Sequence, residues 1–282
     1  MKYLFTVLAL TISFSMNAQI STNNTGASGT YASAIGDATI ATGNTSTAMG
    51  YGSEATADKS TAMGYFAKAN GNFSTAMGRD SKANGVSSAT IGFNTTASDY
   101  GSLVIGVYNS AGSSVTSSAT AFNTANTAFV IGNGTASNAK SDALKVMFNG
   151  DTTVGNDLTV SGDIVINSDM RLKANIISLG STLYKLLQID GKTYTMKRDA
   201  KQKQKIGVLA QDIEKVFPEL VVENNNGIKS VNYQGLVPVL INSIKEQDAK
   251  INQQQVEIEK LKEQDAKISR LEALVEKLIS NK

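Results

Sequence analysis

A serine and a lysine five residues apart, Ser168 and Lys173, are the pair in this sequence best suited to covalent chemistry. A serine hydroxyl is a weak nucleophile until a neighbouring base takes its proton. The chain contains no histidine and no cysteine, which leaves lysine as the natural base and excludes thiol catalysis, disulfides and zinc–thiolate sites. Lysine is a base only when neutral, a state that burial or a cationic neighbour such as Arg171 favours.

The spacing permits a reaction of the chain with itself. Ser168 would attack the carbonyl of Asn167, and Lys173 would accept the hydroxyl proton and return it to the leaving amine. An ester formed by an N→O acyl shift is a second route. Asp169 would orient the lysine or cap a following helix. The same residues also fit a plain N-cap followed by a solvated lysine, so the spacing leaves both interpretations open.

The region before this pair is a repeat array with a period of 14 residues. The motif Ser-Thr-Ala-Met-Gly occurs at Ser46–Gly50, Ser60–Gly64 and Ser74–Gly78. The period fits one coil of a parallel β-solenoid, with two short strands and two tight turns. We expect the alanines and the Met/Ile position to point inward. The repeated positions are Gly36, Gly50, Gly64, Gly78, Gly92 and Gly106; Ala27, Ala41, Ala55, Ala69, Ala83, Ala97 and Ala111; and Ile35, Met49, Met63, Met77, Ile91 and Ile105.

Two other interpretations of the array are possible. A disordered Gly/Ser/Thr linker would not hold an apolar residue in phase over six or seven copies. A calcium-binding β-roll would need regular aspartates in its turns, and the array has few acidic residues.

The 14-residue phase is lost after Ala111, and the related phrase Ala128–Gly132 follows out of register. Apolar and polar residues alternate through 146–164 between turn signals, which predicts a β-rich neck over residues 115–167. Both prolines and most charges lie beyond Ser168. Apolar spacing predicts helices over 176–187 and 206–217, the second one ending at Phe217-Pro218.

The C-terminal residues 244–282 are predicted to form a coiled coil. Two sets of apolar residues repeat every seven positions and are offset by three, which indicates a stammer. Isoleucine-rich seams favour bundles of more than two helices, so we expect a trimeric coil. The alternative is one amphipathic helix packed on its own domain. The seam residues are Ile244, Ile251, Ile258, Leu261, Ile268, Leu271, Val275 and Leu278.

The N-terminus predicts export. Lys2 precedes an apolar run, Tyr3–Phe14, and small or polar residues follow through Ala18, as in a secretory signal peptide over 1–18 that leaves Gln19 first. The run is shorter than the ~20 residues of a spanning helix, which argues against the alternative of a membrane anchor. We expect a secreted or cell-surface bacterial protein with no transmembrane segment after signal removal. A net charge of +2 gives no reason to expect a nucleic-acid partner.

The repeats resemble the head repeats of YadA-like trimeric adhesins, over about Ala27 to Ala111. The resemblance implies a left-handed parallel β-roll, assigned here to residues 19–114, that packs as a homotrimer. The outer-membrane anchor of that family has no counterpart in this sequence.

The region after the neck resembles the intramolecular chaperone domain of phage endosialidases and other tail spikes and fibres. The resemblance spans about Ser168 to Gln254, and we assign the domain, α/β or mainly α, to residues 168–243. It implies a domain that trimerises the chain, assists its folding and then cuts itself off between Asn167 and Ser168, with Ser168 and Lys173 as the dyad. Some relatives also use a histidine. The motifs are Ser-Asp-x-Arg-Leu-Lys, Leu183–Leu186, Ile206–Val221, Val231–Tyr233 and Leu236–Ile241.

The leading hypothesis is therefore an exported homotrimeric fibre or adhesin-like protein that cleaves itself once as a serine peptidase, without cofactor or metal. A host, matrix or glycan ligand of the head is left unidentified. The alternative is an uncleaved surface fibre with a C-terminal trimerisation clamp. An enzyme acting on an external substrate is disfavoured because the acidic residues of the array form no paired-carboxylate site. They are Asp37, Glu54, Asp58, Asp80 and Asp99.

Overall fold

The computed structural model describes residues 22–197, 199–224 and 227–280. The predicted signal peptide lies outside the described residues. The chain divides into two compact units, Met1–Ile164 and Val165–Lys282, which we describe one after the other.

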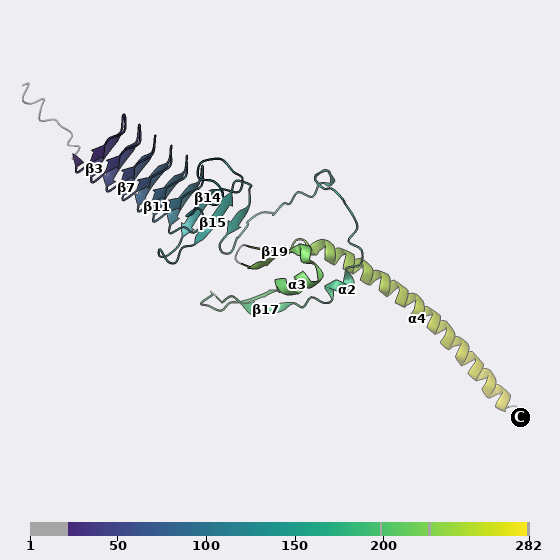
Figure 1. Ribbon diagram of the computed structural model, residues 1–282. Helices are drawn as coiled ribbons and strands as arrows, with labels where there is room; N and C mark the ends of the chain where they lie inside the picture. Colours follow the sequence, from purple (N-terminus) through teal and green to yellow (C-terminus); the bar gives the residue numbers. More distant parts are fainter. Residues whose placement is uncertain (1–21, 198, 225–226, 281–282) are drawn as a thin grey trace, which may run out of the picture. The chain divides into compact units, whose positions relative to one another are not determined.

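The first unit is built on a parallel β-solenoid of about six turns (Figure 1). Each coil contributes one strand of five residues to one sheet and one strand of two residues to a second sheet, and neighbouring strands pair 14 residues apart, as Gly50 does with Gly64. This confirms the predicted fold and period. The long strands, after a short β1 (Thr22–Asn23), are β3 (Ser33–Asp37), β5 (Thr47–Tyr51), β7 (Thr61–Tyr65), β9 (Thr75–Arg79), β11 (Ala89–Phe93) and β13 (Leu103–Val107). The short strands are β2 (Gly26–Ala27), β4 (Ile40–Ala41), β6 (Glu54–Ala55), β8 (Lys68–Ala69), β10 (Lys82–Ala83) and β12 (Thr96–Ala97).

Alanine side chains fill the solenoid core. Ala48 of a long strand and Ala55 of a short strand are completely buried, as are their equivalents in the next coils. The prediction that the Met/Ile position points inward is wrong: Met49 follows Ala48 and is only half-buried. Successive side chains of a strand point to opposite faces, so the buried alanine places the methionine on the outer face. Ala27, at the first coil, is also exposed rather than buried.

Two columns of glycine allow the coils to approach this closely. A Cβ built on Gly43 would lie 1.8 Å from the carbonyl oxygen of Ala57, and one built on Gly64 would lie 2.1 Å from that of Gly78. Gly64 also has a φ of +131°, which side chains with a Cβ rarely adopt. The regular glycines of the sequence are therefore required by contact between successive backbones.

The segment Ala128–Gly132, which is out of register with the 14-residue period, continues the solenoid in the structure. β14 (Thr127–Asn133) pairs parallel to β13, with Gly132 opposite Gly106. The intervening loop is fastened by the buried carboxylate of Asp99, which accepts hydrogen bonds of 2.7 Å from the amides of Thr116 and Thr127. β15 (Asp142–Met147) and β16 (Thr152–Val154) then extend the same sheet in antiparallel fashion. These are the short strands expected in the 115–167 region, and residues 155–164 follow without further strands.

The second unit combines short helices with two small hairpins. Its core consists of Ile213, Val216, Phe217, Leu220 and Val239. The elements are the 3₁₀ turn η1 (Met170–Leu172), α2 (Leu183–Leu186), the hairpin of β17 (Lys192–Thr195) and β18 (Gln204–Gly207), α3 (Ala210–Val216), η2 (Pro218–Leu220), the hairpin of β19 (Val221–Glu223) and β20 (Lys229–Val231), and α4 (Leu236–Ser280). Of the two predicted classes, the mixed α/β composition is the one observed.

Two predicted helices are shorter than expected. Of the helix predicted over 176–187, only α2 forms, and Gly180, shortly before it, has a non-helical φ of +67°. Of the helix predicted over 206–217, the first residues belong to strand β18, which pairs with β17. The predicted stop is confirmed, since α3 ends at Val216 and η2 begins at Pro218.

A single continuous helix, α4, ends the described chain (Figure 1). Val239 and Ser243, near its beginning, are buried against the unit's core, whereas every residue from Asn252 to Ser280 is exposed. All residues of the predicted seam are exposed, for example Ile258 at 45% and Leu278 at 71%. This form is consistent with a coiled coil. Among the described helices, we find none with the length and apolar character needed to cross a membrane.

Candidate active site

A tight turn brings Ser168 and Lys173 together. Asp169 caps the 3₁₀ turn η1 by accepting a 2.8 Å hydrogen bond from the backbone amide of Arg171. The amides of Leu172 and Lys173 donate to the carbonyls of Asp169 and Met170, which closes the turn. The chain therefore doubles back, and the Lys173 Nζ lies 2.7 Å from the Ser168 Oγ, donating a hydrogen bond to it. The two residues singled out by spacing are in direct contact.

The neighbouring charges pair with each other. The Arg171 guanidinium holds the Asp169 carboxylate through contacts of 2.6 Å from Nη2 and 3.0 Å from Nε. This guanidinium, with the backbone amide of the same residue, lowers the pKa of Asp169, and the carboxylate in turn raises the pKa of Arg171. Asp169 therefore serves as the cap of the turn, one of the two roles expected for it, and Arg171 is engaged by Asp169.

The whole segment around the scissile bond predicted by resemblance is open to solvent. Every residue from 155 to 181 is exposed, including Asn167, Ser168 and Lys173. Exposure leaves the hydroxyl and the peptide bond accessible but does not supply the burial that favours a neutral lysine. The single chain thus brings the Ser168 hydroxyl and the Lys173 amine into contact in surroundings that are open to water.

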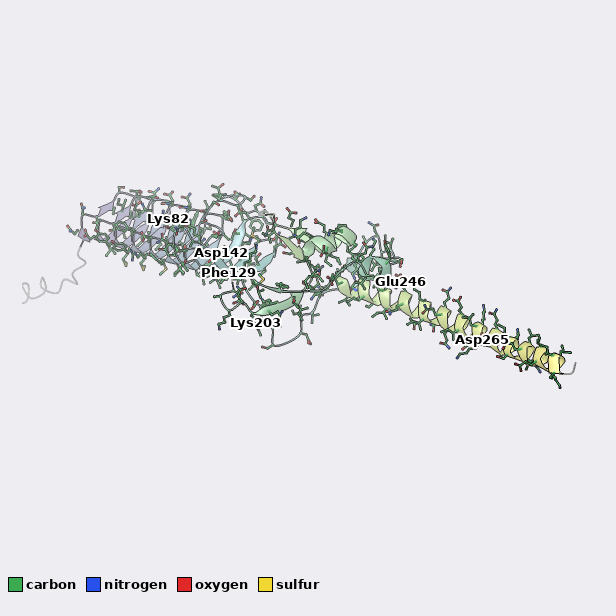
Figure 2. All side chains as sticks on the ribbon, turned by 90° about the horizontal axis from the view of Figure 1, so that it is seen from below. Lys82, Phe129, Asp142, Lys203, Glu246 and Asp265 are labelled. Carbon is green, nitrogen blue, oxygen red and sulfur yellow. The ribbon has the colours of Figure 1, made fainter. Side chains whose placement is uncertain are left out.

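A partly buried polar cluster follows this segment in the chain and was not predicted from the sequence. The carboxylate of Glu246, near the N-terminal end of α4 (Figure 2), accepts hydrogen bonds from the Thr182 amide at 2.5 Å and the Ser181 hydroxyl at 2.7 Å. The Thr182 hydroxyl, itself buried, lies 2.9 Å from that of Ser243. The hydrogen bonds to the Glu246 carboxylate lower its pKa, and the bond from the Thr182 amide has the largest effect. The cluster fastens α2, and with it the end of the segment that carries the dyad, to α4.

No local sequence pattern predicts this cluster. Glu246 and Thr182 are 64 residues apart, and Glu246 belongs to a charged stretch that has the composition of an exposed helix face. The one available signal is a pair of small hydroxyl residues, Ser181 and Thr182, directly before an apolar helical turn, which is typical of an N-terminal helix boundary.

The comparisons with known proteins agree with both parts of this architecture. Residues 27–53 and 55–81 match two copies of the family model described as the YadA head domain repeat. Residues 168–222 match the family model described as the chaperone of endosialidase, and this match begins at Ser168. No curated protein matches the chain. The chain thus combines YadA head repeats with a chaperone-of-endosialidase domain, in the order predicted.

Together these two domains suggest a trimeric adhesin or fibre that carries an intramolecular chaperone. They also suggest an extracellular or surface-exposed protein.

Proposed function

We propose that this protein is an exported homotrimeric fibre whose C-terminal domain drives trimerisation and folding and then cleaves the chain between Asn167 and Ser168. The observation that carries the proposal is the 2.7 Å contact of Lys173 Nζ with Ser168 Oγ at the first residue of the matched chaperone domain.

The exposed apolar surfaces support trimerisation. The seam of α4 leaves isoleucine and leucine side chains about half exposed or more, and exposed contiguous apolar surface of this kind marks an interface. The long sheet of the solenoid also presents its Met/Ile column outward, with Ile91 at 46% exposure. Two further copies of the chain would cover both surfaces. Three solenoids held side by side by a C-terminal coil would find their register at a high local concentration.

The proposed cleavage proceeds in two steps. With Lys173 neutral, the Ser168 Oγ attacks the Asn167 carbonyl carbon and its proton passes to Lys173. The bond from that carbon to the Ser168 nitrogen breaks, the nitrogen takes the proton, and an ester joins Asn167 to the serine oxygen. Water hydrolyses the ester, which leaves an Asn167 carboxylate and a free Ser168 amine and hydroxyl. Both side chains are exposed in one chain, so the proposal requires assembly of the trimer to bury the pair, since burial favours a neutral lysine.

Intact mass under denaturing conditions tests the proposal on the expressed mature chain. Wild type should give two fragments that meet at Asn167/Ser168, whereas Ser168→Ala and Lys173→Ala should remain full length. Ser161→Ala, at another exposed serine upstream of the junction, is the matched control and should be cleaved like wild type. Cleavage at another bond, or cleavage of Ser168→Ala at the wild-type rate, contradicts the assigned dyad.

One observation favours the alternative of an uncleaved fibre with a C-terminal clamp. Arg171, the nearest cation in sequence, is bound by Asp169, so this local charge is directed at a carboxylate. Full-length wild type that sediments as a trimer would establish the clamp.

A further inference from the structure

A polar hollow lies at the C-terminal end of the solenoid, within the first unit. It has a volume of about 380 Å³ and is lined by Ser110, Ala111, Lys140, Ser141, Asp142, Lys145 and Thr153. Figure 2 places Asp142 at this end of the stacked strands. Ligand sites are commonly hollows of about 300–1,000 Å³. The size suits one or two sugar rings.

The hollow arises because the two sheets end at different coils. The long sheet continues through β14, β15 and β16, but the short sheet stops at β12. The edge of β12 is covered by the side chain of Asn109, whose amide accepts from the Thr96 amide at 2.8 Å and donates to the Thr96 carbonyl at 2.9 Å. With no short strand opposite β15 and β16, the face that is core in the earlier coils is left open.

The register of the last strands directs a lysine onto this face. Lys145 of β15 stands opposite Val130 of β14 and Thr153 of β16. Directly paired residues of neighbouring strands project on the same side of a sheet. Val130 is completely buried in the core, so Lys145 and Thr153 project on the core-facing side of the sheet. Lys145 is half-buried, which is consistent with its side chain lying beside the end of the core.

The hollow carries an excess of positive charge. Lys140 and Lys145 both line it, and among the described residues neither makes an ion pair. Its one carboxylate, Asp142, is occupied by the backbone amides of Ser110 at 2.9 Å and Ala111 at 2.7 Å. Two lysines therefore line a hollow whose one carboxylate already accepts two backbone hydrogen bonds.

We propose that this hollow binds an acidic sugar, a glycan unit that carries a carboxylate or sulfate. The two lysines would hold the anion. The hydroxyls of Ser110, Ser141 and Thr153 would bond to sugar hydroxyls, and the lining offers little apolar side chain for an acyl or aromatic ligand. This names a ligand class for the head region of the proposed fibre. The site lies before Asn167, so it stays with the solenoid whether or not the chain is cleaved.

The test measures binding of fluorescently labelled oligosaccharides to the full chain. Hyaluronate oligosaccharides carry carboxylates, chondroitin sulfate oligosaccharides add sulfates, and dextran is neutral. Wild type should bind one or both acidic glycans and leave dextran unbound, and binding should weaken as salt rises. The arm that binds more tightly distinguishes carboxylate from sulfate as the preferred anion.

Variants connect binding to the hollow. The double change Lys140→Gln with Lys145→Gln should weaken acidic-glycan binding at least tenfold. Lys145→Arg, which keeps the charge, should retain binding within a few fold, and Lys82→Gln, at an exposed lysine of β10, should bind like wild type. Circular dichroism checks that each variant is folded.

Three outcomes would overturn the inference. These are equal binding by the double variant and by Lys82→Gln, binding of dextran as tight as that of the acidic glycans, and binding of polyglutamate at the same affinity as the glycans. The last would show unspecific attraction of polyanions. None of them bears on cleavage, which the fragment masses report separately.

Discussion

Gly64→Ala should destabilise the solenoid far more than an ordinary glycine-to-alanine change. The added Cβ would lie 2.1 Å from the carbonyl oxygen of Gly78, and that atom belongs to a backbone held on both sides by strand pairing. A φ of +131° lies in a region that is almost exclusive to glycine, so a residue with a Cβ suffers backbone strain of about 1–2 kcal/mol there. The contact can be relieved only by moving β7 and β9 apart.

The cost follows from the hydrogen bonds that this movement breaks. Each strand hydrogen bond contributes about 1 kcal/mol net, and separation around one residue affects about two of them. With the backbone strain, the total loss is about 3–4 kcal/mol. In a domain of 150–250 residues, each kcal/mol lowers the melting temperature by about 2–4 °C, so the solenoid should melt about 10 °C lower. Gly26→Ala is the matched control, since its Cβ would meet no atom within 4 Å and its φ is not positive.

Thermal unfolding followed by circular dichroism compares the two variants with wild type on the full chain. Hydrogen exchange of the β7 and β9 amides assigns the transition to the solenoid. Gly64→Ala should lose protection there first, because neighbouring coils stabilise one another locally. If Gly64→Ala and Gly26→Ala melt together, within about 2 °C, the coils are not held in the close contact described, and the reasoning fails.

Three further outcomes are expected. The attachment of α2 to α4 should weaken in acid. The pKa of Glu246 in the folded protein is below its ordinary value, so the stability that its carboxylate contributes is fully present above the ordinary pKa. That stability is lost as the pH falls through the lowered pKa of the folded protein. Hydrogen exchange at Thr182 measures this, and Glu246→Gln should remove the pH dependence. Tyr65→Ala should destabilise the solenoid by about 1–2 kcal/mol, because its ring stacks on Tyr51 at 5.2 Å and meets Phe66 edge-on at 4.7 Å. Ile258→Asp should shift the assembly from trimer towards monomer in sedimentation, since it places a charge in the exposed seam of α4.

Matched variants accompany the last two predictions. Tyr31 is 87% exposed, so Tyr31→Ala should leave stability unchanged. Gln253→Asp adds the same charge to α4 away from the seam and should sediment like wild type. Loss of assembly in both helix variants would mean that charge alone, rather than the seam, controls it. A Tyr65→Ala protein as stable as wild type would deny the ring contacts an energetic role.

Much of the solenoid could be predicted because its determinants are local and repeated. A glycine every 14 residues marks one position where coils touch, and the same contact recurs at each coil. The placement of Met49 was predicted wrongly for a physical reason. Hydrophobicity alone favours methionine for a core, but a core as narrow as this one accepts only the methyl group of Ala48. The width of the core, rather than the hydrophobicity of the residue, decides which face each side chain takes.

The candidate active site also has parts that the sequence predicts and parts that it does not. The contact between Ser168 and Lys173 needs only one tight turn, so it depends on residues close together in the sequence, although the spacing alone left open whether the pair is catalytic or a plain N-cap. Arg171 was expected to act as a cationic neighbour of Lys173, but its guanidinium pairs with the opposite charge of Asp169. The bonds of Glu246 to Ser181 and Thr182 join residues more than 60 positions apart and leave no periodic trace.

The sequence by itself determined the period of the solenoid, the order of the two domains, the pairing of Ser168 with Lys173 and the seam of α4. Each of these depends on neighbours in the chain or on repetition. Only the tertiary structure decided that the phrase at 128–132 re-enters the sheet as β14, that the short sheet ends earlier than the long one, and that Lys145 consequently faces an open hollow. These features arise where strands distant in sequence pair across an irregular loop, and strand pairing between distant segments depends on register, which composition does not record.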